Sequence, residues 1–450
     1  MKKIASGFLL VAGMWLVAPV CSQAAGIYAP YIDMTAYPTP VIDQIGVQQG
    51  IQQFTLAFVV SGGGACTPSW GGVQNIGTGS SSGLLTSIAT SVTNYRGKGG
   101  EVAVSFGGAS GVPLMQSCTS VSTLQAAYQA VIDVYNLTHI DFDIEGAAQE
   151  DTAAITRNFQ AVAQLQSVMA AKGMHLHVTL TLPVLTTGLT QDGVKILNAA
   201  LSSNVSVDVI NAMTMDYGGA VADMGQAAIQ AASALYSQID AAFKVVGQTK
   251  TDAQLWQLVG VTPMIGMNDV QGEIFALPNA QNVVNIVQTN GIGLLASWSV
   301  GRDQSCPGNG AYTSPSCSGI VQSPYAFAKL FRQVNGHWGA GVAQDSSYGG
   351  SGSAGNSGSG AAWNASQTYL GGATVTYQGA TYQAQWWTQG DVPGQAAVWK
   401  QLSGPMTTWS AGAAYTGGTC VTYQGAKYCA QWWTQGNVPS SGGVWVKSPS

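Results

Sequence analysis

Three acidic residues alternate with apolar ones in one short run, and their spacing could support acid–base chemistry. Asp141, Asp143 and Glu145 are separated by single apolar residues. Residues two apart on a β-strand point to the same face, so the three carboxyl groups would stack at intervals of about 6.6 Å. Carboxylates this close cannot all stay ionised, and at least one should keep its proton near neutral pH. A general acid needs such a proton, and the outermost group, Glu145, is best placed to reach a substrate.

The spacing alone is equally compatible with an acidic metal site or a structural cluster of acids, and the surrounding elements favour chemistry. Eight β-rich runs are separated by Ala-rich amphipathic stretches such as 122–135 and 152–172, which predicts an α/β fold, a closed (β/α)8 barrel. Chemistry in such a barrel lies at the carboxyl ends of the strands, and the acidic run ends the fourth. The eight runs are Ile27–Ile32, Phe54–Val60, Val102–Phe106, Ile140–Ile144, His177–Leu182, Val209–Met215, Leu258–Pro263 and Gly293–Ser299.

Four motifs within residues 26–338 resemble, in the same order, those of family-18 glycoside hydrolases. Residues 138–145 resemble the DxxDxDxE signature, with Thr138 in place of its first Asp. Residues 105–108 (Ser-Phe-Gly-Gly) resemble the SxGG motif of the third strand, and residues 213–217 (Met-Thr-Met-Asp-Tyr) resemble the motif of the sixth. Trp298 resembles the tryptophan that floors the cleavage subsite.

The resemblance implies a retaining mechanism in which the nucleophile is the carbonyl oxygen of the substrate's own 2-acetamido group, an exception to the two-carboxylate scheme. Glu145 would protonate the glycosidic oxygen. Asp143 would orient the acetamido N–H, and Asp141 would share a proton with Asp143. Asp216 or Tyr217 would hold the acetamido group from the other side. In the family the Tyr precedes the Asp, whereas here it follows, so the assignment of Tyr217 is less secure than that of Asp216.

Residues near other strand ends are predicted to line the pocket. Trp298 would stack under a sugar ring, although a buried barrel tryptophan is the alternative. For Tyr28, Met213 and Met215, core packing is an equally good alternative, and two glycines are also predicted to line the pocket. These predicted lining residues are Tyr28, Met213, Met215, Gly107 and Gly108.

The segments after the seventh and eighth runs predict the form of the groove. Asp269 and Arg302 are interpreted as solvated loop charges. Residues 267–291 leave room for about one helix and for no inserted domain, which predicts an open, shallow groove and cleavage within the polymer chain.

The last 90 residues contain a repeat with an offset of 46 residues. The two copies resemble the family 5/12 chitin-binding modules, which are small and all-β. Adjacent tryptophans in each copy would point to opposite faces of a strand, one filling the core and one binding chitin. These pairs are Trp386 with Trp387 and Trp432 with Trp433.

Composition and termini complete the domain map. Residues 1–24 have the basic start, apolar stretch and small residues of a secretory signal, and residues 341–361 are a Gly/Ser-rich linker. The predicted domains are therefore a signal peptide at 1–24, a barrel at 25–340, the linker, and modules at 362–404 and 405–450. Export permits disulfides, for which we expect the pairs Cys66–Cys118, Cys306–Cys317 and Cys420–Cys429.

Charge and histidine spacing restrict the partners. Only 8% of residues are charged and the net charge is −5, so nucleic acid is not expected as a partner, and no membrane span remains beyond the signal. The four histidines show no HExxH spacing, so neither a metal nor another cofactor is expected. We expect a secreted monomer.

The sequence thus predicts an endo-acting chitinase that hydrolyses β-1,4 N-acetylglucosamine linkages with retention. Two alternatives stay open: an endo-β-N-acetylglucosaminidase acting on N-glycans, against which the tail repeats argue, and a non-catalytic chitin-binding lectin, against which the presence of Glu145 argues.

Overall fold

The computed structural model describes residues 26–77, 83–219, 221–349 and most of 361–448, apart from 366, 370–372, 385–387, 397, 405, 407, 416 and 418. The predicted signal peptide lies outside the described residues.

Each of the eight predicted runs contains a strand, which confirms the α/β fold class. The fourth strand, β7, ends at Asp143, two residues before the last acid of the run. In chain order the strands are β1 (Ile27–Tyr28) with β2 (Tyr31–Asp33), β3 (Gln53–Ser61), β6 (Glu101–Gly107), β7 (His139–Asp143), β8 (His177–Leu185), β10 (Val209–Met213), β11 (Val259–Thr262) and β14 (Leu294–Leu295).

The strands lie side by side in chain order, and all these pairs are parallel. The first run connects the two ends of this order. Its first half, β1, pairs with β14, and its second half, β2, pairs with β3. Pro30, which has no N–H to donate, separates the halves, and its carbonyl still accepts from Thr55. Residues 27–33 therefore hydrogen-bond to the strands on both sides.

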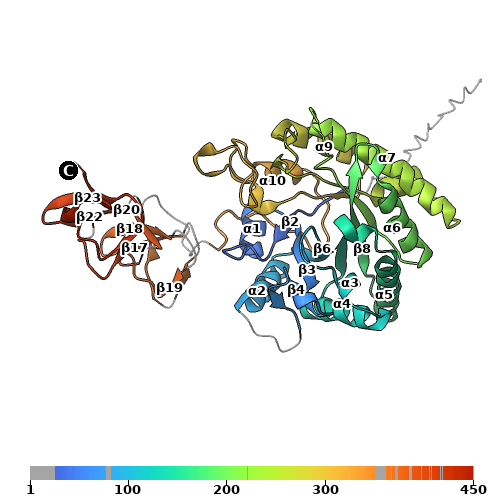
Figure 1. The fold of residues 1–450 in the computed structure, drawn as a ribbon, viewed down its shortest axis with the longest axis horizontal. Helices are drawn as coiled ribbons and strands as arrows, with labels where there is room; N and C mark the ends of the chain where they lie inside the picture. The colour runs from blue at the N-terminus through green and yellow to red at the C-terminus, as the bar shows by residue number, and fades with distance from the viewer. Residues whose placement is uncertain are drawn as a thin grey trace, which may run out of the picture.

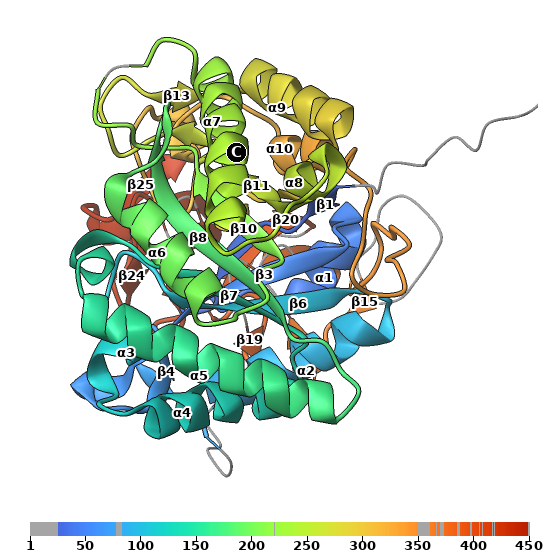
Figure 2. The same ribbon diagram turned by 90° about the vertical axis from the view of Figure 1, so that its right-hand side faces the viewer.

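Helices cover the outside of these strands, as Figures 1 and 2 show. Several begin at a Ser, Thr or Asp whose side chain accepts a hydrogen bond from the third residue of the helix, as at Ser120, Asp151 and Thr190. The helices are α1 (Ile42–Gln49), α2 (Gly83–Gly97), α3 (Leu114–Ser117), α4 (Val121–Tyr135), α5 (Thr152–Ala171), α6 (Gln191–Ser202), α7 (Met224–Val245), α8 (Asp252–Leu258), α9 (Leu277–Asn290) and α10 (Ala326–Phe331).

The segment between the seventh and eighth strands is short, as predicted. Residues 263–293 hold a two-stranded hairpin, β12 (Gly266–Met267) with β13 (Ile274–Phe275), followed by α9. No inserted domain stands over the carboxyl ends of the strands at this point.

The linker begins later than its composition indicated, because the start of the predicted 341–361 segment packs on the barrel. Val342 is buried, and its N–H and C=O both hydrogen-bond to Gln52. The Tyr348 hydroxyl donates to Asp43 of α1, and the Lys98 ammonium lies over the Tyr348 ring. The barrel domain therefore extends to residue 349 rather than ending at 340.

The tail forms two small all-β modules, as predicted. A Trp and a Tyr make edge-to-face contacts in each core, with ring centroids 5.2 Å apart in the first module and 5.3 Å in the second. These pairs are Tyr369 with Trp399 and Tyr415 with Trp445. The strands of the first module are β15 (Ala361–Ala362), β16 (Thr368–Tyr369), β17 (Thr374–Tyr377), β18 (Ala380–Ala384), β19 (Thr388–Gln389) and β20 (Trp399–Ser403). Those of the second are β21 (Ala414–Tyr415), β22 (Cys420–Tyr423), β23 (Ala426–Ala430), β24 (Thr434–Gln435) and β25 (Trp445–Ser448).

All three predicted disulfides are confirmed. The Cα atoms are 4.6 Å apart in Cys66–Cys118, 4.9 Å in Cys306–Cys317 and 4.0 Å in Cys420–Cys429. The last pair faces across β22 and β23, where the first module has Thr374 opposite Gln383. Among the described residues, no helix is both long and apolar enough to cross a membrane.

The second module has the Cys420–Cys429 disulfide where the first has Thr374 opposite Gln383, and this difference predicts that the two modules differ in stability. Replacing Cys420 and Cys429 together by the Thr and Gln of the first module removes a short covalent loop. The free energy of unfolding of the second module should fall by about 2–3 kcal/mol. Denaturant unfolding followed by tryptophan fluorescence of the isolated segment 405–450 measures this change, and an unchanged midpoint would contradict it.

Candidate active site

Asp141 and Asp143 on β7, and Glu145 just after it, point into the barrel, because the apolar residues between them point outward. Phe142 packs edge-to-face on Tyr128 of α4 at 5.2 Å, and Ile140 and Ile144 belong to the same core. The exposed fraction rises along the row from 2% at Asp141 to 4% at Asp143, and Glu145 is half-buried. The last acid therefore has the best access to solvent and ligand.

Asp141 is held by hydroxyl groups from three other strands. It accepts hydrogen bonds from Ser105 Oγ at 2.6 Å, Thr181 Oγ1 at 2.7 Å and Tyr31 Oη at 2.9 Å. Burial raises its pKa to about 6, and these hydrogen bonds counteract part of the rise. Asn211 extends the network by donating to Thr181 and accepting from Thr262. A polar layer thus crosses the barrel beneath the cavity.

Asp143 and Glu145 are joined by a hydrogen bond, and the protonation state of each affects the pKa of the other. Burial raises the pKa of Asp143 well above its ordinary value, and the charges of Glu145 and Asp141 raise it further. Burial also raises the pKa of Glu145; the hydrogen bond from Asp143 opposes this rise, and the charge of Asp216 adds to it. Asp143 Oδ1 is buried and has no partner among the described residues, so one acceptor remains free next to Glu145.

These carboxyl groups open into a cavity of about 230 Å³ whose walls mix acidic and apolar side chains. Trp298 forms one wall, stacked on Phe58 with ring centroids 5.5 Å apart. Trp298 also lines a second hollow of about 400 Å³. The first cavity is lined by Tyr31, Phe58, Ala109, Asp143, Glu145, Thr181, Met213, Met215, Asp216, Thr262, Met264, Asp269 and Trp298.

The predicted glycines lie beneath this cavity rather than on its wall. Gly107 has a φ of +112°, and a Cβ there would come within 2.0 Å of the Asp143 carbonyl oxygen. Gly108 donates its N–H to that same oxygen, and a Cβ on it would meet the Phe58 ring at 2.8 Å. Both glycines therefore permit the neighbouring backbone to approach β7 closely.

Two residues predicted to touch the substrate lie elsewhere. Tyr28 is 3% exposed and packs on Phe331 of α10, because it belongs to the core-facing first half of its run. The cavity receives Tyr31 from the second half instead. Tyr217 follows Asp216, whose left-handed φ of 50° turns the chain. The Tyr217 ring packs against the core and its buried hydroxyl has no hydrogen-bond partner among the described residues.

Asp216 faces the cavity, as predicted, and accepts a hydrogen bond from the Val270 N–H. Burial raises its pKa. Asp269 also lines the cavity, and it is exposed, as expected of a solvated loop charge.

The interpretation of Arg302 as a solvated loop charge is wrong, because Arg302 is 1% exposed and donates to the carbonyls of Ile265, Met267 and Ser314. Burial lowers its pKa to about 10, so the guanidinium stays charged at neutral pH. It joins the loops that follow the seventh and eighth strands and holds the chain next to Asp269 in place.

The second module exposes an aromatic pair. Trp432 and Trp433 are 57% and 59% exposed, in the bend between β23 and β24. The expectation that one of them fills the core is wrong, because the pair is not on a strand and Trp445 fills the core instead. The corresponding pair of the first module, Trp386 and Trp387, lies outside the described residues.

Sequence reasoning missed three aromatic and sulfur-containing wall residues, Tyr31, Phe58 and Met264. Strand alternation could have indicated Tyr31, since it lies in the first run three residues after Tyr28 and therefore points to the other face of the strand. Phe58 and Met264 had no comparable signal, because apolar residues at strand ends read equally well as core.

Comparison with known proteins agrees with this geometry. A family model described as carbohydrate-binding module family 5/12 matches residues 362–400 and 408–446. The chain is 37% identical over 321 residues to the "Probable bifunctional chitinase/lysozyme" of Escherichia coli (strain K12), and 36% identical over 288 residues to "Endochitinase 11" of Metarhizium anisopliae. These matches cover 68% and 62% of this chain but only 34% and 52% of the two relatives.

The barrel also matches a solved structure, along nearly the whole length of that structure's chain. The catalytic domain of the hyperthermophilic chitinase from Pyrococcus furiosus has a TM-score of 0.59 and 30% sequence identity, covering 69% of this chain and 97% of that one. The eight parallel strands, the row of carboxyl groups at the cavity and the similarity to chitinase domains together indicate a glycoside hydrolase. The chain belongs to the family-18 glycoside hydrolases, the family of these chitinase domains, and its tail carries two family 5/12 carbohydrate-binding modules.

The raised pKa of Asp141 predicts a pH-dependent cost to stability. Between the ordinary pKa of 3.8 and about 6 the folded state binds more protons than the unfolded state, so this group destabilises the fold progressively as pH rises through that window. Asp141→Asn cannot ionise and should lack this loss. Its free energy of unfolding relative to wild type should therefore rise by about 2–3 kcal/mol between about pH 4 and pH 8.

Chemical denaturation at several pH values measures this difference. Asp133→Asn, at an exposed position on α4, serves as the control and should run parallel to wild type. An equally parallel profile for Asp141→Asn would show that burial does not shift this group.

Proposed function

We propose that this chain is an endo-acting chitinase that cleaves β-1,4 N-acetylglucosamine linkages with retention of configuration, by substrate-assisted catalysis. The observation that carries the proposal is the row of three inward carboxyl groups, ending with Glu145 in the cavity that Trp298 borders. The chitinase names of the two curated relatives and of the archaeal structure support the same substrate class.

Glu145 is the proposed general acid. Its raised pKa favours the protonated form at the start of the reaction, and its side chain faces the cavity. It donates its proton to the glycosidic oxygen as the C–O bond breaks. The resulting carboxylate then takes a proton from the water that completes hydrolysis.

Asp143 is the proposed partner of the acetamido group. Its free Oδ1 can accept the acetamido N–H, which turns the carbonyl oxygen of that group toward the anomeric carbon. This oxygen bonds to the anomeric carbon as the glycosidic C–O bond breaks, which gives a cyclic intermediate. The intermediate carries positive charge, and a nearby carboxylate stabilises it. When Glu145 loses its proton, the distribution of protons between Asp141 and Asp143 changes. The three hydroxyl groups around Asp141 can hydrogen-bond to it whether it is protonated or ionised.

The wall opposite the acids suits a sugar. A pyranose presents an apolar C–H face that stacks on an indole, and Trp298 lines two hollows, which favours adjacent sugar rings on a continuous chain. The short segment 263–293 adds no further wall, which supports binding along an open groove and cleavage within the polymer.

The tail modules are proposed to hold the enzyme on insoluble chitin. The exposed indoles of Trp432 and Trp433 offer an apolar surface for the faces of sugar rings, and the matched family of both modules supports this role. Two linked modules raise the effective concentration at a polymer surface. Three disulfides and the apolar start of the sequence support secretion.

Removing the proposed proton donor tests the chemistry. Glu145→Gln keeps the shape and a hydrogen-bonding group but cannot protonate the leaving oxygen. The rate on soluble N-acetylglucosamine oligomers should fall by about 10²–10⁴-fold with little change in unfolding midpoint. The matched control Glu150→Gln, five residues along and exposed, should retain wild-type activity. A wild type no more active than Glu145→Gln would instead favour a chitin-binding lectin.

Removing the modules tests the division of labour. A chain without residues 362–450 should lose activity on insoluble chitin several-fold, by up to the order of 10²-fold, while its rate on soluble oligomers stays unchanged. The double variant Trp432→Ala/Trp433→Ala should give part of the same loss, and Val446→Ala, another exposed apolar position of that module, should give none. Equal losses on both substrates would contradict a purely anchoring role.

A further inference from the structure

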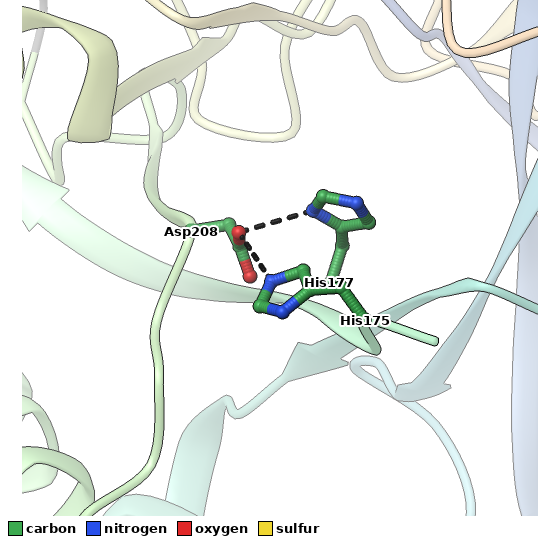
Figure 3. A group of neighbouring side chains, drawn as sticks. All are labelled: His175, His177 and Asp208. Atoms are coloured by element: carbon green, nitrogen blue, oxygen red, sulfur yellow. Dashed lines mark hydrogen bonds and ion pairs between the residues drawn. The ribbon is translucent and has the colours of Figure 1, made fainter. Parts of the chain in front are cut away.

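Two histidines and an aspartate lie close together at the end of the barrel opposite the cavity. His175 and His177 precede and begin β8, and Asp208 immediately precedes β10, the neighbouring strand. His175 Nε2 and His177 Nδ1 each lie 3.0 Å from Asp208 Oδ1. Figure 3 shows both rings turned toward the carboxylate. All three candidate ligand atoms lie within 4.8 Å of one another.

Strand geometry accounts for the pair of histidines. Residues two apart on a strand point to one side, so the His-x-His spacing places both rings together. Leu176 between them is 1% exposed and faces the core. Neither ring is deeply buried, with side-chain exposures of 49% for His175 and 42% for His177, so an ion could reach the group from solvent.

The group is held in place by neighbours that are not themselves ligands. Asp208 Oδ2 accepts from the Val178 N–H at 2.9 Å, which leaves Oδ1 directed at the histidines. The His177 ring stacks on His139, its cross-strand neighbour, at 4.3 Å and 8°, and His139 stacks on Trp338 at 4.3 Å. These stacking contacts restrict the orientation of the His177 ring.

We propose that His175, His177 and Asp208 form a binding site for a divalent transition-metal ion of the zinc class, with water in the remaining position. Two imidazoles and one carboxylate are ordinary zinc ligands. Metal–ligand bonds of about 2.0–2.1 Å at tetrahedral angles separate neighbouring ligand atoms by about 3.3 Å, so the observed 3.0 Å contacts need only a small adjustment. The ion would replace the hydrogen bonds that now join these atoms.

The chemistry inferred for this site is structural rather than catalytic. It would join the start of β8 to the segment that leads into β10, at the amino ends of the strands, while the acidic cavity lies at the carboxyl ends. Bound metal would therefore stabilise the barrel without entering the hydrolytic steps. The inference does not depend on the proposed function, and its test uses no activity measurement.

Calorimetric titration of untagged, chelator-treated full-length protein with zinc chloride near neutral pH tests the site. We expect one equivalent to bind with a midpoint at micromolar rather than millimolar zinc, and to raise the thermal unfolding midpoint. His175→Ala, a change at a half-exposed ring, should weaken binding by at least about 10–100-fold while the metal-free protein keeps its unfolding midpoint.

Two variants sharpen the result. Asp208→Asn removes the charged ligand but retains an oxygen for the Val178 N–H, and should also lose tight binding. His337→Ala is the matched control, since this exposed histidine bonds to the Gly339 carbonyl outside the group and should leave the titration unchanged. Zinc binding only at millimolar concentration, or binding that survives His175→Ala, would overturn the proposal.

Discussion

The burial of three carboxyl groups in one row is the constraint on which the rest of the site depends. Moving an ionised carboxylate out of water is costly, so such groups keep their protons or find several hydrogen-bond donors. The deepest acid, Asp141, does both, with three hydroxyl donors and a pKa of about 6. The next two have raised pKa values and face the cavity. Burial thus favours a retained proton beside the cavity, which is what the proposed mechanism requires.

The other parts of the barrel keep this row in position. Gly107 lets the third strand pass close to the Asp143 carbonyl, where any side chain would collide. Arg302 ties together the loops after the last two strands through three backbone carbonyls, which places Asp269 on the wall. Trp298 and Phe58 stack to form a rigid apolar side opposite the acids. Buried carboxyl groups are therefore concentrated beside the cavity.

Alternation and motif order predicted the barrel and the acid row, and the even number and positions of the exported cysteines predicted the three disulfides. The prediction failed where a chain changes direction. Tyr217 was expected in the site, but the left-handed turn at Asp216 directs its ring into the core. Trp432 and Trp433 were treated as strand residues, whereas they occupy a bend that exposes both. Arg302 looked solvated because a single sequence does not reveal which carbonyls surround a loop cation.

The protonation of Glu145 tests this account most directly. The chain has only four glutamates, at 101, 145, 150 and 273, so the carboxyl carbons of protein labelled with ¹³C at glutamate Cδ can be titrated individually by NMR, with Glu145→Gln providing the assignment. The account predicts that the Glu145 resonance titrates clearly above the ordinary range of glutamate, since burial outweighs its hydrogen bond with Asp143. A Glu145 carboxyl that loses its proton at or below that ordinary range would contradict it.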